Sequence, residues 1–219
     1  MSDSRLLKIY HRLPPSARSA VASLRGYYLN YSRYGAETEK KVTQALEREF
    51  WSTAELEKWT NGRLEQVLGR AATRVPYYRE QWELADPGNG DSWKTLQNWP
   101  VLRKNALRGN KTAFVADDVN PRRLFLEHTS GTTGTPVEFW SDRATLQAWY
   151  ALAEARWRRW YGISRRDRWA IIGGQHVVPF KQEKPPFWVW NAGLNQLYMS
   201  ALHIKPDFLS HYLEAIRRY

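Results

Sequence analysis

Cysteine is absent from the 219-residue sequence, which excludes disulfide bonds and thiolate metal sites within it. Long apolar runs are also absent, since no stretch approaches the roughly 18 residues that a membrane-spanning helix needs. The first residues carry charges where a secretory signal would have an apolar core. These absences predict a cytoplasmic protein and allow a reducing compartment.

Acidic residues are scarce relative to basic ones, with 22 Asp and Glu against 33 Lys and Arg and a net charge of +11. The excess favours anionic partners, namely nucleotides, coenzyme A, anionic lipid or nucleic acid, without distinguishing between them. Hydrophobic residues make up 42% of the chain, including 12 Trp and 12 Tyr, which argues for a packed core and against disorder. The length suits one large domain.

The most informative stretch is residues 128–136, where Gly131 and Gly134 stand among threonines and a serine. Apolar residues on both sides predict a strand, a tight polar loop and a second strand. Glycine lets the backbone approach a ligand, successive amides can form an anion site, and hydroxyls suit phosphate oxygens. We therefore expect nucleotide phosphates to be bound by Thr129, Ser130, Gly131, Thr132, Thr133, Gly134, Thr135 and Pro136.

The composition of this loop also raises two other interpretations. A Walker A loop is excluded because Gly131 and Gly134 are too close together and no lysine follows Gly134. A Gly/Thr-rich hairpin that binds no ligand is the remaining alternative, because such residues are ordinary turn signals.

Residues 129–136 resemble the phosphate-binding signature of the adenylate-forming enzymes. The upstream stretches 75–79 (VPYYR) and 99–104 (WPVLRK) are similar to the phenylacetate–coenzyme A ligase family, in the branch found with capsular polysaccharide biosynthesis. The resemblance runs from about Leu13 to the end of the chain. It implies an α/β fold with a helical N-terminal region, followed by the first sheet elements of the family's large domain. We expect a basic N-terminal segment at 1–34 and an incomplete part of that large domain at 35–219.

The resemblance also implies a chemistry. Family members activate a carboxylate as acyl-AMP with ATP and Mg, then transfer the acyl group to coenzyme A or another nucleophile. The expected partners are a nucleotide and a carboxylate substrate. No catalytic residue or metal ligand is assigned, because the family's ribose-binding aspartate and mobile lysine have no counterpart here, and Val137 stands where a lysine is often found. We expect an N-terminal fragment that is inactive alone and lacks the C-terminal part of the fold.

A second candidate region lies at the carboxyl end of a predicted buried strand at 168–174, which ends in two glycines. A long helix at 143–161 precedes it, so strand, helix and strand suggest a βαβ-like unit, in which ligands lie beyond the carboxyl ends of strands. The position is also similar to the family's acyl-substrate region. The substrate-binding candidates are Gly173, Gly174, Gln175 and His176. The alternative is a plain glycine turn with a surface histidine.

Helical periodicity makes specific predictions about burial. A helix at 37–50 should bury Val42, Leu46 and Phe50, and a second should begin at a capping box of Ser52 and Glu55. The second helix should bury a stripe of Leu56, Trp59, Leu64, Val67, Leu68 and Ala71. The helix at 143–161 should bury Leu146, Trp149, Tyr150, Ala153, Trp157 and Trp160, with Glu154 and Arg158 paired on its outer side.

Two further functions compete with the ligase. Cations alternate with aromatics at 156–160 (RWRRW) and 165–169 (RRDRW), as in modules that stack nucleic-acid bases. The predicted burial of Trp157 and Trp160 argues against this module, so the ligase interpretation expects no specific nucleic-acid partner. A non-catalytic scaffold at a membrane surface is the third function. The basic segment 1–34 would then give peripheral contact with the inner membrane face, whereas the alternative is a helix packed on the protein body.

Overall fold

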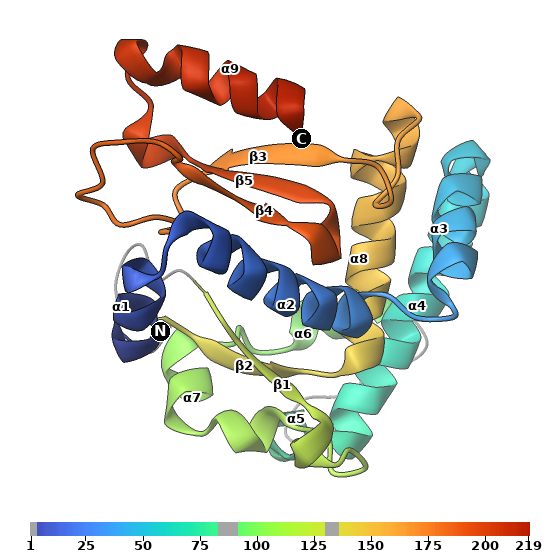
Figure 1. Cartoon of the computed structure of the whole chain (residues 1–219). Helices are drawn as coiled ribbons and strands as arrows, with labels where there is room; N and C mark the ends of the chain where they lie inside the picture. The colour runs from blue at the N-terminus through green and yellow to red at the C-terminus, as the bar shows by residue number, and fades with distance from the viewer. Residues whose placement is uncertain (1–3, 83–91, 130–135) are drawn as a thin grey trace. The chain divides into compact units, whose positions relative to one another are not determined.

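The computed structural model of the protein describes residues 4–82, 92–129 and 136–219 (Figure 1). The chain contains helices and two small sheets, which is compatible with the predicted α/β class. It divides into two compact units, and each is described by itself. One unit joins Met1–Val42 to Tyr150–Tyr219, and the other is the continuous segment Thr43–Trp149.

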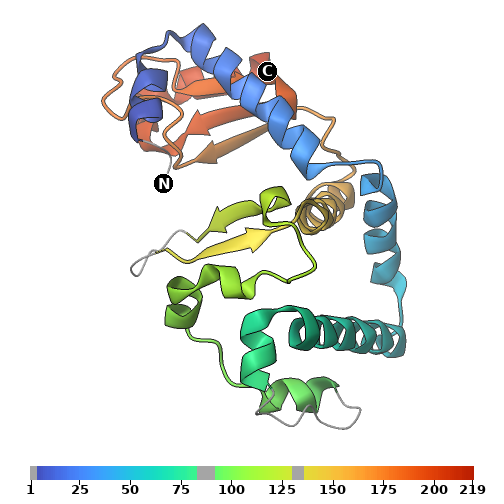
Figure 2. The ribbon, with the colours of Figure 1, turned by 90° about the horizontal axis from the view of Figure 1, so that it is seen from below.

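The discontinuous unit is built on a three-stranded sheet of β3 (Trp169–Gly173), β4 (Trp188–Asn191) and β5 (Gln196–Ser200) in the order β3-β5-β4. β3 and β5 are parallel, whereas β4 and β5 are antiparallel. Helix α9 (Leu209–Arg218) and helix α2 (Pro15–Arg33) cover opposite faces of this sheet (Figures 1 and 2). Its core holds the buried residues Phe187, Leu197, Met199, Tyr212 and Ala215.

Small residues let α2 approach the sheet closely. A Cβ atom added to Gly193 would meet the α2 backbone at Gly26 and Tyr27, so the two segments pack backbone against backbone. The hydroxyls of α2 then accept hydrogen bonds from amides of β4 and of the residue after it: Ser19 Oγ accepts from Trp190 N at 3.2 Å and Ser23 Oγ accepts from Ala192 N at 3.0 Å. The 1–34 segment thus packs through α2 on the body of its unit, the alternative weighed against membrane contact.

Short elements complete the discontinuous unit. They are α1 (Ser4–Arg12), η4 (Arg159–Tyr161), η5 (Ala192–Leu194), η6 (Ala201–His203) and η7 (Pro206–Phe208). Two helices cross from one unit into the other along the chain, namely α3 (Thr38–Glu47) and α8 (Arg143–Trp157).

The continuous unit is largely helical and carries one hairpin. Its helices are η1 (Arg48–Phe50), α4 (Thr53–Arg74), α5 (Pro76–Trp82), α6 (Ser92–Asn98), α7 (Lys104–Gly109), η2 (Lys111–Phe114) and η3 (Pro121–Arg123). The hairpin pairs β1 (Phe125–His128) with β2 (Glu138–Ser141). The predicted capping box is confirmed, because Ser52 and Glu55 exchange side-chain and backbone hydrogen bonds at the start of α4.

The predicted βαβ-like unit is wrong. β2 precedes α8 and β3 follows it, but β2 pairs with β1 and β3 pairs with β5, so the two strands belong to different sheets. The prediction of a buried strand is also wrong for β3. Burial alternates along β3, as in a strand covered on one face, and Ile172 is 51% exposed.

Burial on three helices differs from the periodic predictions. On α8 the carboxylate Glu154 and the alanines Ala151, Ala153 and Ala155 are buried, so the predicted burial of Ala153 is confirmed. The rings of Trp149 and Trp157 are exposed, as is that of Trp160 in η4. Positions 151, 154 and 155 form one helical stripe, so small residues define the packed face and the large aromatics lie off it. Phe50 is 88% exposed in η1. In the predicted stripe of α4 only Leu68 is buried, and Leu56, Trp59 and Val67 are exposed.

Candidate functional site

The predicted strand–loop–strand at 124–140 is an antiparallel hairpin. Phe125 lies opposite Ser141 and His128 opposite Glu138. Thr129 N donates to Val137 O at 3.0 Å, and Val137 N donates to Thr129 Oγ1 at 3.1 Å, so these two residues close the hairpin. Six of the predicted phosphate-binding residues lie outside the described residues: Ser130, Gly131, Thr132, Thr133, Gly134 and Thr135.

Exposure to solvent falls sharply at Val137, the residue that follows the loop. Thr129 and Pro136 are exposed, whereas Val137 is 7% exposed. The side chain that follows Pro136 therefore packs inward, where a lysine would have to bury its ammonium or reorient. The hydroxyl of Thr129 accepts a hydrogen bond from the Val137 amide, so this threonine holds the hairpin closed. Phosphate binding by Thr129 is a separate prediction.

A lysine from η2 pairs with the carboxylate nearest the loop. Lys111 Nζ lies 2.6 Å from Glu138 Oε2 and 6.0 Å from the centroid of the Trp140 ring. The hydrogen bond and charge of Lys111, with a further contribution from His128, lower the pKa of Glu138 below its ordinary value. Lys111 thus neutralises the Glu138 carboxylate at the loop end of the hairpin. This pairing reduces the repulsion between Glu138 and an anion held at the loop.

The 75–79 stretch supports the segment that carries Lys111. Tyr77 stacks on Phe114 with ring centroids 4.2 Å apart, and Tyr78 meets Phe114 edge to face at 5.8 Å. Arg79 Nη1 donates to Asp117 Oδ2 at 2.8 Å, which lowers the pKa of Asp117. Both tyrosines therefore act as packing anchors for η2. Because η2 contacts both α5 and β2, this stretch acts on the hairpin through η2.

The substrate-binding candidates follow the carboxyl end of β3. A Cβ atom added to Gly173 would meet the Tyr198 side chain, so a larger residue there would displace the tyrosine ring. His11 Nε2 lies 2.9 Å from His176 O, and Val177 N donates to Gln175 O at 2.8 Å. Gly173, Gly174, Gln175 and His176 belong to the discontinuous unit and the hairpin to the continuous one.

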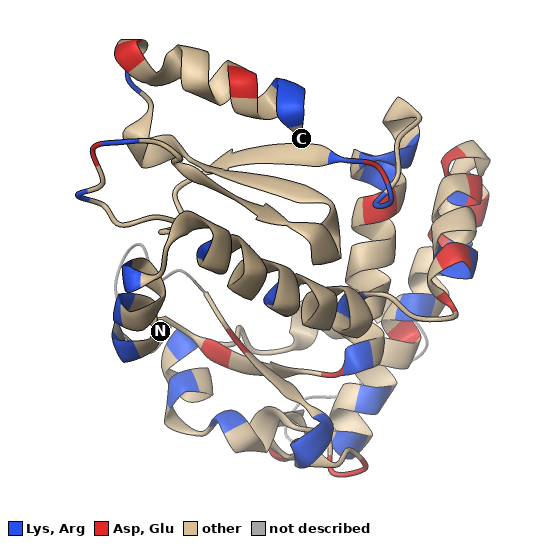
Figure 3. Cartoon of the chain, viewed as in Figure 1, with Lys and Arg blue, Asp and Glu red and all other residues tan. Residues whose placement is uncertain are grey.

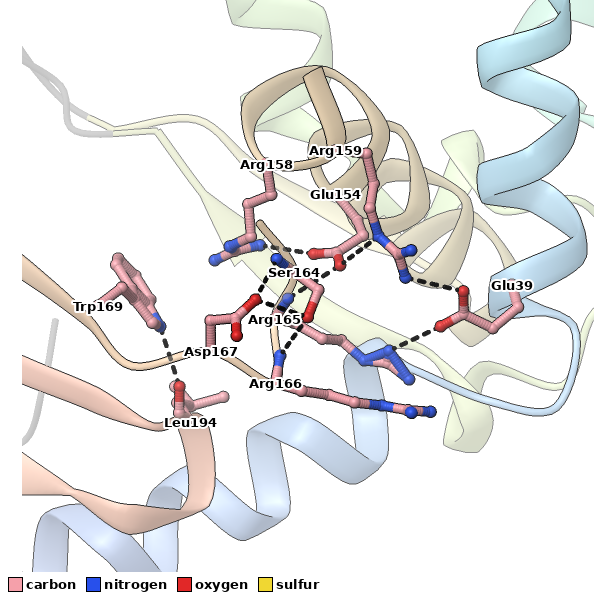
Figure 4. A network of polar contacts seen from close by, with 10 residues as sticks. All are labelled: Glu39, Glu154, Arg158, Arg159, Ser164, Arg165, Arg166, Asp167, Trp169 and Leu194. Atoms are coloured by element: carbon pink, nitrogen blue, oxygen red, sulfur yellow. Dashed lines mark hydrogen bonds and ion pairs between the residues drawn. The ribbon is translucent and has the colours of Figure 1, made fainter. Parts of the chain in front are cut away.

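A buried carboxylate, Glu154, was missed as an organising centre. It is fully buried and accepts from Arg158 Nη1 at 3.1 Å, Arg159 Nε at 3.3 Å and Arg165 N at 2.9 Å (Figure 4). Glu39 extends the network, accepting from Arg159 Nη2 at 3.0 Å and Arg165 Nη1 at 3.2 Å. The predicted pair of Glu154 with Arg158 is confirmed, but it is not on an outer side. The alanines around Glu154 were the available signal.

Neither a metal cluster nor a membrane span is present in the part of the chain that the structure describes. No group of three His, Asp or Glu side chains among 4–82, 92–129 and 136–219 could hold an ion. No helix within the same ranges has the length and apolar character to cross a membrane.

The fold and the hairpin define a mixed helix-and-sheet protein with a candidate anion-binding loop. Comparison with known proteins finds similarity to Protein CapK of Staphylococcus aureus, at 23% identity over 212 residues. The match covers 96% of this chain and 45% of that protein, so the chain spans less than half the length of this relative. No family model and no solved structure matches. The match supports a CapK-like relationship for the chain.

Proposed function

We propose that the chain is the phosphate-holding part of an adenylate-forming ligase that acts in the biosynthesis of an envelope or capsular polysaccharide. The observation that carries the proposal is the hairpin: the Gly/Thr-rich residues 130–136 connect two paired strands, and Thr129 and Val137 close that connection. The pairing of Glu138 with Lys111 suits an anion nearby. The similarity to CapK agrees with the polysaccharide assignment.

In this proposal the loop positions the phosphates of ATP and stabilises the charge on the departing pyrophosphate. Donors aimed at developing charge are an effective way to lower a reaction barrier. A substrate carboxylate attacks the α-phosphate of ATP, pyrophosphate leaves, and the acyl group then passes to coenzyme A or another nucleophile. We assign no magnesium ligand to the chain, because magnesium commonly enters such sites bound to the nucleotide phosphates.

ATP binding by the chain tests the proposal. Gly131→Val and Gly134→Val should each weaken ATP binding about tenfold or more, because a branched side chain obstructs the approach of phosphate to the backbone. Isothermal titration measures the affinity, and circular dichroism checks that the fold is retained. Gly62→Val is the matched control, since nothing lies within 4 Å of a Cβ atom added there. Absence of ATP binding by the parent chain, or equal affinity in both loop variants, would contradict the proposal.

A specific observation favours a second candidate, a module that binds single-stranded nucleic acid. Trp157 is 67% and Trp160 55% exposed, which corrects the prediction that both rings are buried. Arg156 lies 5.0 Å from the centroid of the Trp160 ring. Exposed rings beside arginines suit base stacking combined with phosphate contacts.

Single-stranded DNA at two salt concentrations tests this second function. A nucleic-acid module should lose about tenfold or more in affinity between about 50 and about 200 mM salt, because phosphate contacts release counterions. Trp160→Ala should weaken binding further at both concentrations. Weak binding that is unaffected by Trp160→Ala would rule the module out.

A further inference from the structure

The discontinuous unit contains a cavity of about 650 Å³ lined by the end of α2, by α8 and the segment after it, and by β3 and η5. Its charged lining is entirely basic, formed by Arg33, Arg158, Arg165 and Arg166. Its aromatic lining is formed by Tyr34, Tyr150, Trp157 and Trp169. The volume falls in the range of small-molecule sites, which combine apolar walls with a few convergent polar groups.

The arginines outnumber the carboxylates that pair with them. Glu154 and Glu39 are shared among Arg158, Arg159 and Arg165. Arg33 and Arg166 also line the cavity, and neither has a carboxylate partner within the described ranges. Arg33 instead lies 4.3 Å from the centroid of the Tyr150 ring. Positive charge is therefore left over at the cavity, and a doubly negative group could compensate it.

The buried network holds these arginines in place. Arg165 N donates to the fully buried Glu154, which anchors the segment that follows α8 (Figure 4). Asp167 Oδ2 accepts from Ser164 N at 2.7 Å and from Ser164 Oγ at 3.1 Å, closing the turn that presents Arg165 and Arg166. A guanidinium fixed before the ligand arrives loses less entropy on binding.

Aromatic rings line the same cavity beside the arginines. Arg165 lies 4.6 Å from the centroid of the Tyr34 ring and Arg158 lies 5.0 Å from that of Trp169. Trp169 is itself held by a hydrogen bond of 2.9 Å from its Nε1 to Leu194 O. Trp157, at 67% exposure, offers a large ring accessible to a ligand. Arginine forks suit phosphate oxygens and exposed rings suit stacking on a planar base.

We propose that this cavity binds a phosphate monoester carried on a planar ring, the chemistry of a nucleoside monophosphate. Arg33 and Arg166 take the phosphate and Trp157 stacks on the ring. The site lies within the discontinuous unit, so it is distinct from the hairpin loop and does not depend on the ligase proposal.

Titration of the chain with UMP, uridine and inorganic phosphate tests the site. UMP should bind about tenfold or more tightly than either of its parts, because phosphate and ring are recognised together. The double variant Arg33→Gln/Arg166→Gln should weaken UMP binding about tenfold or more. Trp157→Ala should weaken UMP binding and leave phosphate binding unchanged. Arg122→Gln is the control, an exposed arginine of η3 that is not among the residues lining the cavity.

Two results would overturn the cavity site. One is the absence of UMP binding by the parent chain, and the other is equal UMP affinity in the parent and the double arginine variant. Gly131→Val separates the two proposals, since it should weaken ATP binding and leave UMP binding intact. If Gly131→Val abolishes UMP binding while the double arginine variant retains it, the anion binds at the hairpin and the cavity assignment is wrong.

Discussion

At the scale of single residues, Glu154 is a fully buried charge at the centre of an arginine network. A buried carboxylate loses its hydration, and the loss is offset only when several donors surround it. Glu154 has three: two guanidinium groups and one main-chain amide. Its side chain is fully buried, whereas those of Arg158 and Arg159 are 18% and 35% exposed, so the arginines keep part of their contact with water.

Glu154→Gln should therefore destabilise the fold by about 2 to 3 kcal/mol, somewhat less than the loss of a wholly buried ion pair. The amide removes the charge that compensates two arginines and leaves their hydrogen bonds weaker. Urea unfolding followed by circular dichroism measures the change. Glu214→Gln, on the exposed side of α9, is the control and should shift stability by less than about 0.5 kcal/mol. Equal midpoints for the two variants would contradict the role given to Glu154.

The sequence predicted the pairing of Glu154 with Arg158 but not its burial. An i,i+4 pair depends on helix geometry alone, and its partners were therefore evident. Burial depends on what covers the helix. The three alanines Ala151, Ala153 and Ala155 create room for close packing, whereas a count of large apolar side chains selects the tryptophans instead.

At the scale of elements, Tyr212 links α9 to the sheet. Tyr212 Oη donates to Ser200 O at 2.7 Å, and its ring stacks near Phe187 with centroids 6.1 Å apart. Burial raises the pKa of Tyr212 to about 12 from an ordinary value of 10.0. The folded state therefore favours the neutral phenol, whose contribution is fully present below pH 10.0 and is lost as the pH rises toward about 12.

This shift predicts an alkaline loss of stability of about 2 to 3 kcal/mol from Tyr212. Tyr212→Phe should be less stable than the parent near neutral pH, by about 1 kcal/mol for the lost hydrogen bond. The difference should shrink or reverse as the pH rises from 10.0 toward about 12. Denaturant unfolding across that pH range measures both effects, with Tyr161→Phe as an exposed control. Parallel stability curves for the parent and Tyr212→Phe would contradict the prediction.

Individual elements were predictable where their causes are local. The Ser52–Glu55 capping box follows from residues three apart. The left-handed conformation of Gly162 after η4 suits glycine, which adopts positive φ readily. The partners of the strands were not predictable in this way. β3 pairs with β5 rather than with β2, because strand pairing is decided by contacts across long stretches of chain.

At the scale of the whole molecule, the net charge of +11 is spread over elements of both units, α1 and α7 among them (Figure 3). A diffuse excess attracts anions in general and selects none. Selectivity must come from local geometry, which is why the hairpin and the arginine-lined cavity carry the two binding proposals.

The two candidate sites also differ in how far the sequence could reveal them. The hairpin loop occupies consecutive residues, so glycines, hydroxyl residues and flanking apolar strands were visible together. The cavity was not visible, because its walls come from Arg33 and Tyr34, from residues 150–171 and from residues 193–196. Only the fold brings such distant segments to one place. The 75–79 stretch is intermediate: its resemblance was apparent, whereas its support of η2 through Phe114 was not.

The split between residues 1–42 and 150–219 also bears on biogenesis. Ser23 on α2 bonds to Ala192, a residue 169 positions later in the chain. While a ribosome is still adding the intervening residues, α2 therefore lacks its sheet, whereas the continuous segment 43–149 has its own contacts at hand. Domains generally fold as units in the order of synthesis. β4 and β5 thus dock onto a helix that was made before them, and the side of α2 that carries Ser19, Ser23 and Gly26 stays uncovered until they arrive.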